Sequence, residues 1–215
     1  MLLLLLAATT SLRAQDLADY DYENLTFRGI GLDYGFIWPT RVAATPTYSV
    51  RLDLGFLGPG VRIAPSITYW SSHFRNTELA RLAGQINNLP ALRDRNVTVS
   101  GADLGEIRWS DLSLGLDAHL LFTTPVGVFT YLGAGAAVHA LNGQGDFIES
   151  TFVEDLLDST SAGIAVMAGA ELQLGPRLRV YGEARYNIVS DVRYPGVRLG
   201  GAFMLPPRAP SQSTR

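Results

Sequence analysis

The sequence is dominated by a two-residue alternation between apolar side chains and small or charged ones. Residues 107–122 show it most clearly. The apolar positions are Leu112, Leu114, Leu116, Ala118, Leu120 and Phe122, and the intervening ones are Ser113, Gly115, Asp117, His119 and Leu121. Successive side chains of a β-strand point to opposite faces, so this period predicts a strand with one apolar and one mainly polar face.

Seven further segments follow the same rule. They are residues 26–37, 47–57, 60–70, 126–140, 162–174, 178–189 and 192–205. The chain is therefore expected to form eight antiparallel strands, an even number of the kind that closes into an up-and-down barrel.

The connections between these segments alternate in length. Gly58-Pro59, Thr124-Pro125 and Gly175-Pro176 mark tight turns, whereas residues 39–46, 71–106 and 141–161 form longer loops. The last connection, Ser190-Asp191, is short and departs from the trend. An up-and-down barrel would then carry its tight turns and both ends of the mature chain on one side.

Volume decides which face of the strands points inward. Eight strands with about five large apolar residues each supply about 40 such side chains, far more than the interior of an eight-stranded barrel can hold. The glycine-rich charged face fits inside, so the apolar face must point outward. Only lipid makes such a surface stable, and the sequence therefore predicts a transmembrane β-barrel.

Composition narrows the possible functions. The chain has 17% charged residues, a formal net charge of −3 and no cysteine. These values exclude a disulfide framework, a lipid-attachment cysteine and a thiolate metal site, and they do not suggest a nucleic-acid partner.

The two ends of the sequence lack the alternation that marks the strands. The apolar run of residues 1–8, followed by Ala14, predicts a secretory signal peptide over residues 1–15. We expect a periplasmic segment at 16–24, the barrel at 25–205 and a disordered tail at 206–215.

The inward face carries balanced charges. The expected interior network consists of Asp33, Arg51, Asp53, Arg62, Asp117, Glu171, Arg179, Glu183, Arg185 and Arg198. Counting register from the turns sets Glu183 opposite Arg198 and Asp53 diagonal to Arg62, where opposite charges attract. An ion-paired plug is favoured over a selective pore, because side chains fill a barrel this narrow.

Several residues near strand ends suggest contact with the membrane interface. The aromatic residues expected in two interfacial girdles are Trp38, Tyr48, Trp70, Trp109, Phe122, Tyr194 and Phe203. Arg108 and Arg193 fall on the lipid face near the loop end, where they can reach headgroups. Pro65 lies inside a strand and cannot donate a hydrogen bond, so a bulge or local break is expected there.

Over residues 24–205, the strand count, the loop parity and the two-faced strands resemble the small OmpA/OmpX-type bacterial outer-membrane barrels. The resemblance implies an outer-membrane location without a peptidoglycan-binding domain. Such barrels commonly end on an aromatic residue, whereas here Met204, Leu205 and a polar tail follow Phe203.

The sequence contains few candidates for catalytic or metal-binding residues. If the fourth hairpin turns around Pro125, His139 lies opposite Asp111 with Ser113 diagonal to it, a Ser/His/Asp set that lacks a nucleophile turn or oxyanion hole. The acidic residues of 146–158 lack the spacing of a calcium loop. We expect no catalytic residues, no cofactor and no metal.

The long loops are the segments free to recognise a partner. Apolar residues at helical spacing predict helices at 77–89 and 147–157. The first interpretation is a non-enzymatic envelope or surface-interaction role through loops 71–106 and 141–161, beside contact with outer-membrane lipid. A small-solute channel is the second interpretation, and a lipid-modifying enzyme the third.

Overall fold

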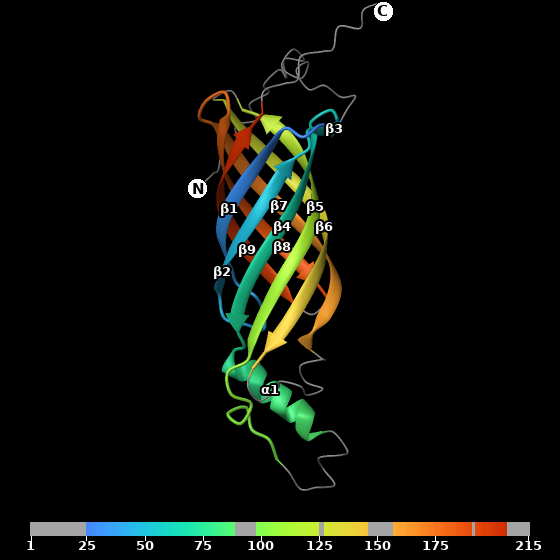
Figure 1. Cartoon of the computed structure of the whole chain (residues 1–215), viewed down its shortest axis with the longest axis vertical. Helices are drawn as coiled ribbons and strands as arrows, with labels where there is room; N and C mark the ends of the chain where they lie inside the picture. The colour runs from blue at the N-terminus through green and yellow to red at the C-terminus, as the bar shows by residue number, and fades with distance from the viewer. Residues whose placement is uncertain (1–24, 89–97, 125–126, 146–156, 191, 206–215) are drawn as a thin grey trace, which may run out of the picture.

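The computed structural model describes residues 25–88, 98–124, 127–145, 157–190 and 192–205. These residues form one β-sheet and one helix (Figure 1). The elements are β1 (Gly29–Ile37), β2 (Thr45–Asp53), β3 (Phe56–Gly58), β4 (Val61–His73), α1 (Asn76–Asn87), β5 (Arg108–Thr123), β6 (Val128–Gln144), β7 (Ser159–Gln173), β8 (Leu178–Val189) and β9 (Arg193–Met204).

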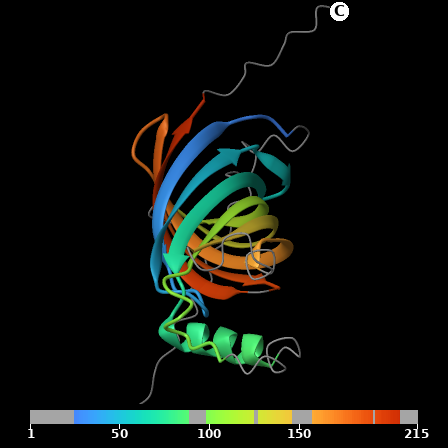
Figure 2. The same ribbon diagram turned by 60° about the horizontal axis from the view of Figure 1, so that its bottom comes forward.

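The sheet closes on itself. Neighbouring strands pair in the order β2-β1-β9-β8-β7-β6-β5-β4-β3, and pairing of β2 with β4 completes the ring. Because β2 and β3 are two parts of one interrupted strand, the barrel has eight strands, all antiparallel. Figure 2 shows the ring of strands from the loop end. The predicted fold class is confirmed.

The two faces of each strand differ as the alternation predicts. Along β1, each inward residue is buried and each outward residue is exposed, and β5 repeats this pattern over most of its length. Leu32, Leu114 and Leu199 are 64%, 63% and 74% exposed, although they lie in the middle of strands. The apolar face is therefore the outer surface, and the polar face lines the interior.

The expected irregularity at Pro65 lies mainly in the neighbouring strand. β4 runs unbroken through Pro65, which lies opposite Leu116 of β5. On the other side, the β2–β4 ladder ends at Arg51 opposite Ser66, and pairing resumes at Phe56 opposite Arg62 with the register shifted by one residue. The missing N–H of proline thus coincides with a break between β2 and β3.

One end of the barrel carries the tight turns and the other carries the loops. The two ends of the described chain meet at the tight-turn end, where the Leu205 amide donates to the carbonyl of Arg28 at 2.6 Å. At the loop end, β6 and β7 extend beyond the predicted limits, to Gln144 and from Ser159. The signal peptide, the periplasmic segment and the tail lie outside the described residues.

The aromatic girdles contain only part of the expected set. Trp38, Tyr48, Phe122 and Phe203 are exposed on the outer face. The expectation is wrong for three residues, which point into the barrel and are buried: Trp70, Trp109 and Tyr194. Along each strand, residues with even numbers face one side of the sheet and residues with odd numbers face the other, which we call their parity. Each of the three aromatic residues has the parity of the polar residues of its strand, and this overrides the preference of aromatic side chains for the interface.

The loop between β4 and β5 contains the predicted helix. α1 lies beyond the strand ends (Figure 1), and its buried face consists of Leu79, Leu82, Ala83 and Ile86. The second predicted helix, at 147–157, falls outside the described residues except for Leu157. In the described part of the chain, no helix is long and apolar enough to cross a membrane.

A charge placed on the outer face tests its contact with lipid. Leu32→Arg is expected to lower the free energy of unfolding by about 2–4 kcal/mol, the cost of arginine near the bilayer midplane. The matched control is Leu57→Arg at the tight-turn end, where the side chain is equally exposed and the cost should be about 0–1 kcal/mol. Urea titration of the protein in vesicles measures both. Equal costs would contradict a lipid-facing band centred on the strands.

Candidate functional site: the barrel interior and its loop-end cap

The interior is filled by side chains that reach across it from opposite walls. Small residues on the inner face make this possible. The ring of Tyr131 lies so close to Gly169 that a Cβ there would collide with it, and Tyr181 stands in the same relation to Gly200. Glycine is therefore required at both positions, because any larger residue would displace a buried tyrosine.

The first part of the charge network lies near the tight-turn end. The guanidinium of Arg62 donates to Glu171 at 2.8 Å, and Arg179 donates to the other oxygen of the same carboxylate at 2.9 Å. Asp53 lies 3.7 Å from Arg62. One carboxylate thus links arginines of β4 and β8, which lie on opposite sides of the barrel.

The second part lies deeper in the interior. Glu183 accepts hydrogen bonds from Arg51 at 3.0 Å and from the Tyr131 hydroxyl at 2.9 Å. The guanidinium of Arg51 also lies 3.8 Å from the ring centre of Tyr181. Glu183 is the direct cross-strand partner of Arg198. This carboxylate is therefore surrounded by cations and one hydroxyl donor.

Two further pairs complete the set of ten residues. Two guanidinium nitrogens of Arg185 donate hydrogen bonds to the two carboxylate oxygens of Asp117, at 2.6 and 3.0 Å, and both side chains are almost fully buried. Asp33 accepts a hydrogen bond from Tyr181 at 3.0 Å and lies 3.7 Å from Arg198. A contact of 3.9 Å between Arg185 and Glu183 connects these pairs to the deeper network.

Sequence reasoning missed three interior residues of this network. His119 stacks on Tyr131, with 4.6 Å between ring centres, and its Nδ1 lies 3.2 Å from Arg62. Since arginine can only donate, Nδ1 of His119 is the acceptor. Tyr131 and Tyr181 supply the hydroxyls described above. The signal that could have found all three is their parity, which matches that of the charged residues.

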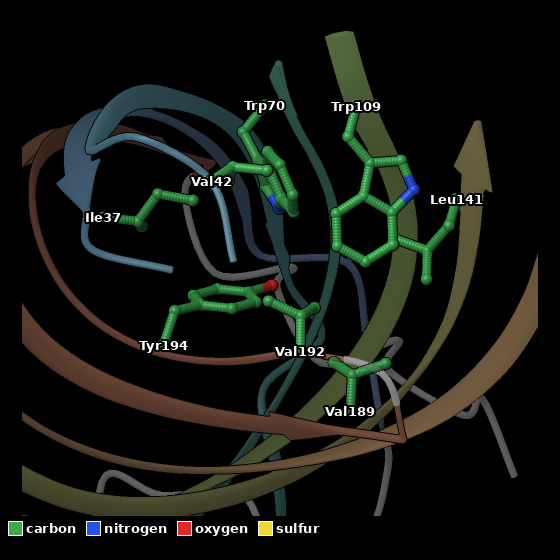
Figure 3. Close-up of a cluster of buried hydrophobic side chains, with 8 residues drawn as sticks. All are labelled: Ile37, Val42, Trp70, Trp109, Leu141, Val189, Val192 and Tyr194. Atoms are coloured by element: carbon green, nitrogen blue, oxygen red, sulfur yellow. The ribbon is translucent and has the colours of Figure 1, made fainter. Parts of the chain in front are cut away.

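An apolar cluster closes the interior at the loop end. It consists of Ile37, Val42, Trp70, Trp109, Leu141, Val189, Val192 and Tyr194. Figure 3 shows these side chains converging from opposite walls. The ring of Trp70 meets Trp109 edge to face at 6.2 Å and Tyr194 at 5.9 Å. We call these eight residues the aromatic seal.

The candidate Ser/His/Asp set lies at the aromatic seal. His139 Nδ1 is 2.8 Å from Asp111, which also accepts a hydrogen bond from the indole of Trp70 at 3.0 Å. The expected register is wrong by two residues: Ser113, and not Asp111, lies opposite His139, because the last paired residues before the β5–β6 turn are Thr123 and Phe129. The Ser113 hydroxyl donates to the carbonyl of Thr68 at 3.4 Å. All four side chains are buried. The arrangement holds an Asp–His pair and lacks an activated serine.

The loop between β4 and β5 packs on the seal as an ordered cap. We call residues 74–88 and 98–107 the loop cap. Its apolar cluster combines α1 with Leu104, Ile107 and Leu157. Arg75 donates to the carbonyls of Val42 and Pro39 at 2.9 and 3.0 Å, which joins the cap to the β1–β2 loop. In the exposed turn of the cap, hydrogen bonds from Ser100 lower the pKa of the Asp103 carboxyl.

The charge network borders a small cavity. A cavity of about 20 Å³ lies beside Arg51, Arg62 and Tyr181, which is room for about one water molecule. Within the described ranges, no three His, Cys, Asp or Glu side chains are placed to hold a metal ion.

This protein is similar to known proteins in its structure, whereas sequence comparisons find no match. No protein-family model matches the sequence, and no curated protein matches it either. The crystal structure of Neisserial surface protein A is 17% identical, with a TM-score of 0.53, over 83% of this chain and 97% of that one. Ail, the attachment invasion locus protein of Yersinia pestis, was crystallised with the heparin analogue sucrose octasulfate. That structure is 13% identical, with a TM-score of 0.51, over 83% of this chain and 97% of Ail.

These similarities establish the fold. The chain has the architecture of the eight-stranded outer-membrane β-barrels. Its outer face is apolar around the ring and is stable only in lipid. A closed barrel with these properties is an integral protein of the bacterial outer membrane.

Proposed function

We propose that this protein is a closed, non-enzymatic barrel that holds an ordered loop cap at the cell surface, where the cap contacts another envelope or surface component. The observation that carries the proposal is the double closure of the interior. Ion-paired side chains fill its length, and the aromatic seal covers the loop end.

A small-solute channel fits the interior less well. A conducting pore needs a continuous water-filled path, whereas buried pairs such as Arg185–Asp117 and Arg62–Glu171 lie across the lumen. We therefore expect no stable conducting state in planar bilayers.

A lipid-modifying enzyme also fits less well. Such an enzyme needs an activated nucleophile open to lipid. Ser113 and His139 are buried beneath the aromatic seal, and the serine hydroxyl donates to a backbone carbonyl.

The ordered cap is the part of the molecule suited to recognition. Function in rigid scaffolds concentrates on loops. The cap has its own apolar cluster, and the side chain of Asn87 donates to and accepts from the backbone of Val99, at 2.7 and 2.8 Å. A loop held in this way presents a defined surface at little entropic cost on binding.

Loop replacement tests the proposal. His73 and Arg108 are direct cross-strand partners, so residues 74–107 can be replaced by an Asn-Gly hairpin turn. Leu141 and Ser159 allow the same replacement of residues 142–158. Both variants should fold, as read by heat-modifiable gel mobility. Removal of the cap should change hydrophobic-dye uptake by whole cells or their adhesion to surfaces.

The control is Pro59→Asn, which creates a similar turn at the opposite end of the barrel and should change neither readout. If both loop variants fold and leave dye uptake and adhesion unchanged, the loops have no such role. A large stable conductance of the parent protein would favour the channel instead.

A further inference from the structure

The outer wall of the barrel contains a groove. It has a volume of about 780 Å³, and residues of β4 to β9 line it. This size falls within the range of about 300–1,000 Å³ that small-molecule sites occupy. The groove opens toward the lipid, because its rim consists of outward residues such as Leu114, Leu116 and Ile164.

The groove exists because small residues lie between large ones. Ala136 is directly between Leu116 of β5 and Ile164 of β7. Ala162 lies beside Val138, one step closer to the loop end. The two alanines form the floor, and the longer side chains around them form walls that an extended apolar chain can lie between.

The positively charged side chain of Arg193 lies at the loop-end edge of the groove. Ile164 pairs with Ile188, and Ile188 pairs with Arg193, so the three lie in one row across adjacent strands. At the usual strand spacing, the backbone of Arg193 is about 10 Å from that of Ile164. Arg193 is exposed on the lipid face and also lines the groove. It is the first residue of β9, at the loop end of the strand, from which a long arginine side chain can reach lipid headgroups.

We propose that this groove binds one acyl chain of a lipid with an anionic phosphate headgroup, and that Arg193 holds the phosphate. The apolar floor and walls match the acyl chain, and the cation matches the headgroup. Arginine binds phosphate oxygens through paired N–H donors. The site is separate from the loop cap and does not depend on the function proposed for it.

Charge favours a lipid over a second copy of the chain. In a two-fold dimer formed through this face, the groove of one copy would meet the same groove of the other. Two Arg193 side chains would then approach each other without a counter-charge from the groove. An anionic lipid supplies that charge, so the second copy is the competing outcome of the test.

The test uses the full-length protein in phosphatidylcholine vesicles with spin-labelled lipid probes. Electron paramagnetic resonance gives the motionally restricted fraction of labelled phosphatidylglycerol and of labelled phosphatidylcholine. The parent should prefer phosphatidylglycerol by about fivefold at this site, as one arginine near an anionic headgroup implies. Arg193→Gln should reduce the preference to about one, and Arg108→Gln, which removes another lipid-face arginine, should leave it unchanged.

Filling the groove tests the acyl-chain part. The double variant Ala136→Leu/Ala162→Leu should lose the restricted phosphatidylglycerol population. The control Ala168→Leu/Ala170→Leu, on the same outer wall of β7 but outside the groove, should keep it. A preference that survives Arg193→Gln would overturn the proposal, as would equal behaviour of the two double variants. Cross-linked dimers that only groove filling abolishes would assign the groove to a second copy.

Discussion

Arg185→Met is expected to lower the free energy of unfolding by about 3–5 kcal/mol, the cost of breaking a buried ion pair from one side. Arg185 holds both oxygens of Asp117, and the two side chains are 5% and 2% exposed. Methionine keeps much of the volume but leaves the carboxylate without its counter-charge. Chemical unfolding in vesicles, followed by tryptophan fluorescence, measures the change.

Two variants separate the charge effect from packing. Arg179→Met makes the same replacement at a pair whose arginine is 26% exposed, and it should cost up to about 1 kcal/mol. Combining Arg185→Met with Asp117→Asn should recover part of the stability, because the stranded charge is gone. If Arg185→Met costs no more than Arg179→Met, the interior network contributes little to stability.

Trp70→Ala should have an effect of similar size, about 3–5 kcal/mol, since it opens a cavity in the aromatic seal. The indole packs against Trp109 and Tyr194 and donates to Asp111 at 3.0 Å. Removing it therefore takes away two ring contacts and the donor of a buried carboxylate. Heat-modifiable gel mobility and chemical unfolding both report the loss.

The shape and the hydrogen bond of Trp70 can be separated. Trp70→Phe keeps much of the packing but leaves Asp111 without this donor, so its cost should be about 1–3 kcal/mol. Trp38→Ala removes a lipid-facing indole whose ring meets Phe36 at 5.5 Å, and it should cost about 1 kcal/mol. Equal costs for Trp70→Ala and Trp38→Ala would mean that the seal does not hold the loop end together.

Local alternation was enough to predict the strands, their number and the direction of the apolar face. A strand has a period of two, so a residue such as Leu114 or Asp117 reveals its side of the sheet from its position alone. The volume of the two faces then decides that the charged one lies inside. The helix at Asn76–Asn87 followed from apolar spacing in the same way.

Parity was a better guide than residue type where the two disagreed. Trp70, Trp109 and Tyr194 were assigned to the membrane interface because aromatic residues favour it, yet all three lie on the inner face of their strands. Pro65 gave a correct signal of irregularity, but the break lies in the neighbouring strand. The sequence does not indicate which of two paired strands is interrupted.

Which charges meet across the barrel depends on how the sheet closes. Neighbours such as Glu183 and Arg198 follow from the length of one turn, whereas Arg51 and Glu183 are 132 residues apart and meet because the barrel closes with a particular stagger. The aromatic seal and the groove beside Arg193 arise in the same way, from residues on several strands brought to one level. The two faces of each strand could be predicted from the amino-acid order alone, because they depend on neighbouring residues. The closure of the sheet determined the contacts, because these depend on how distant strands align.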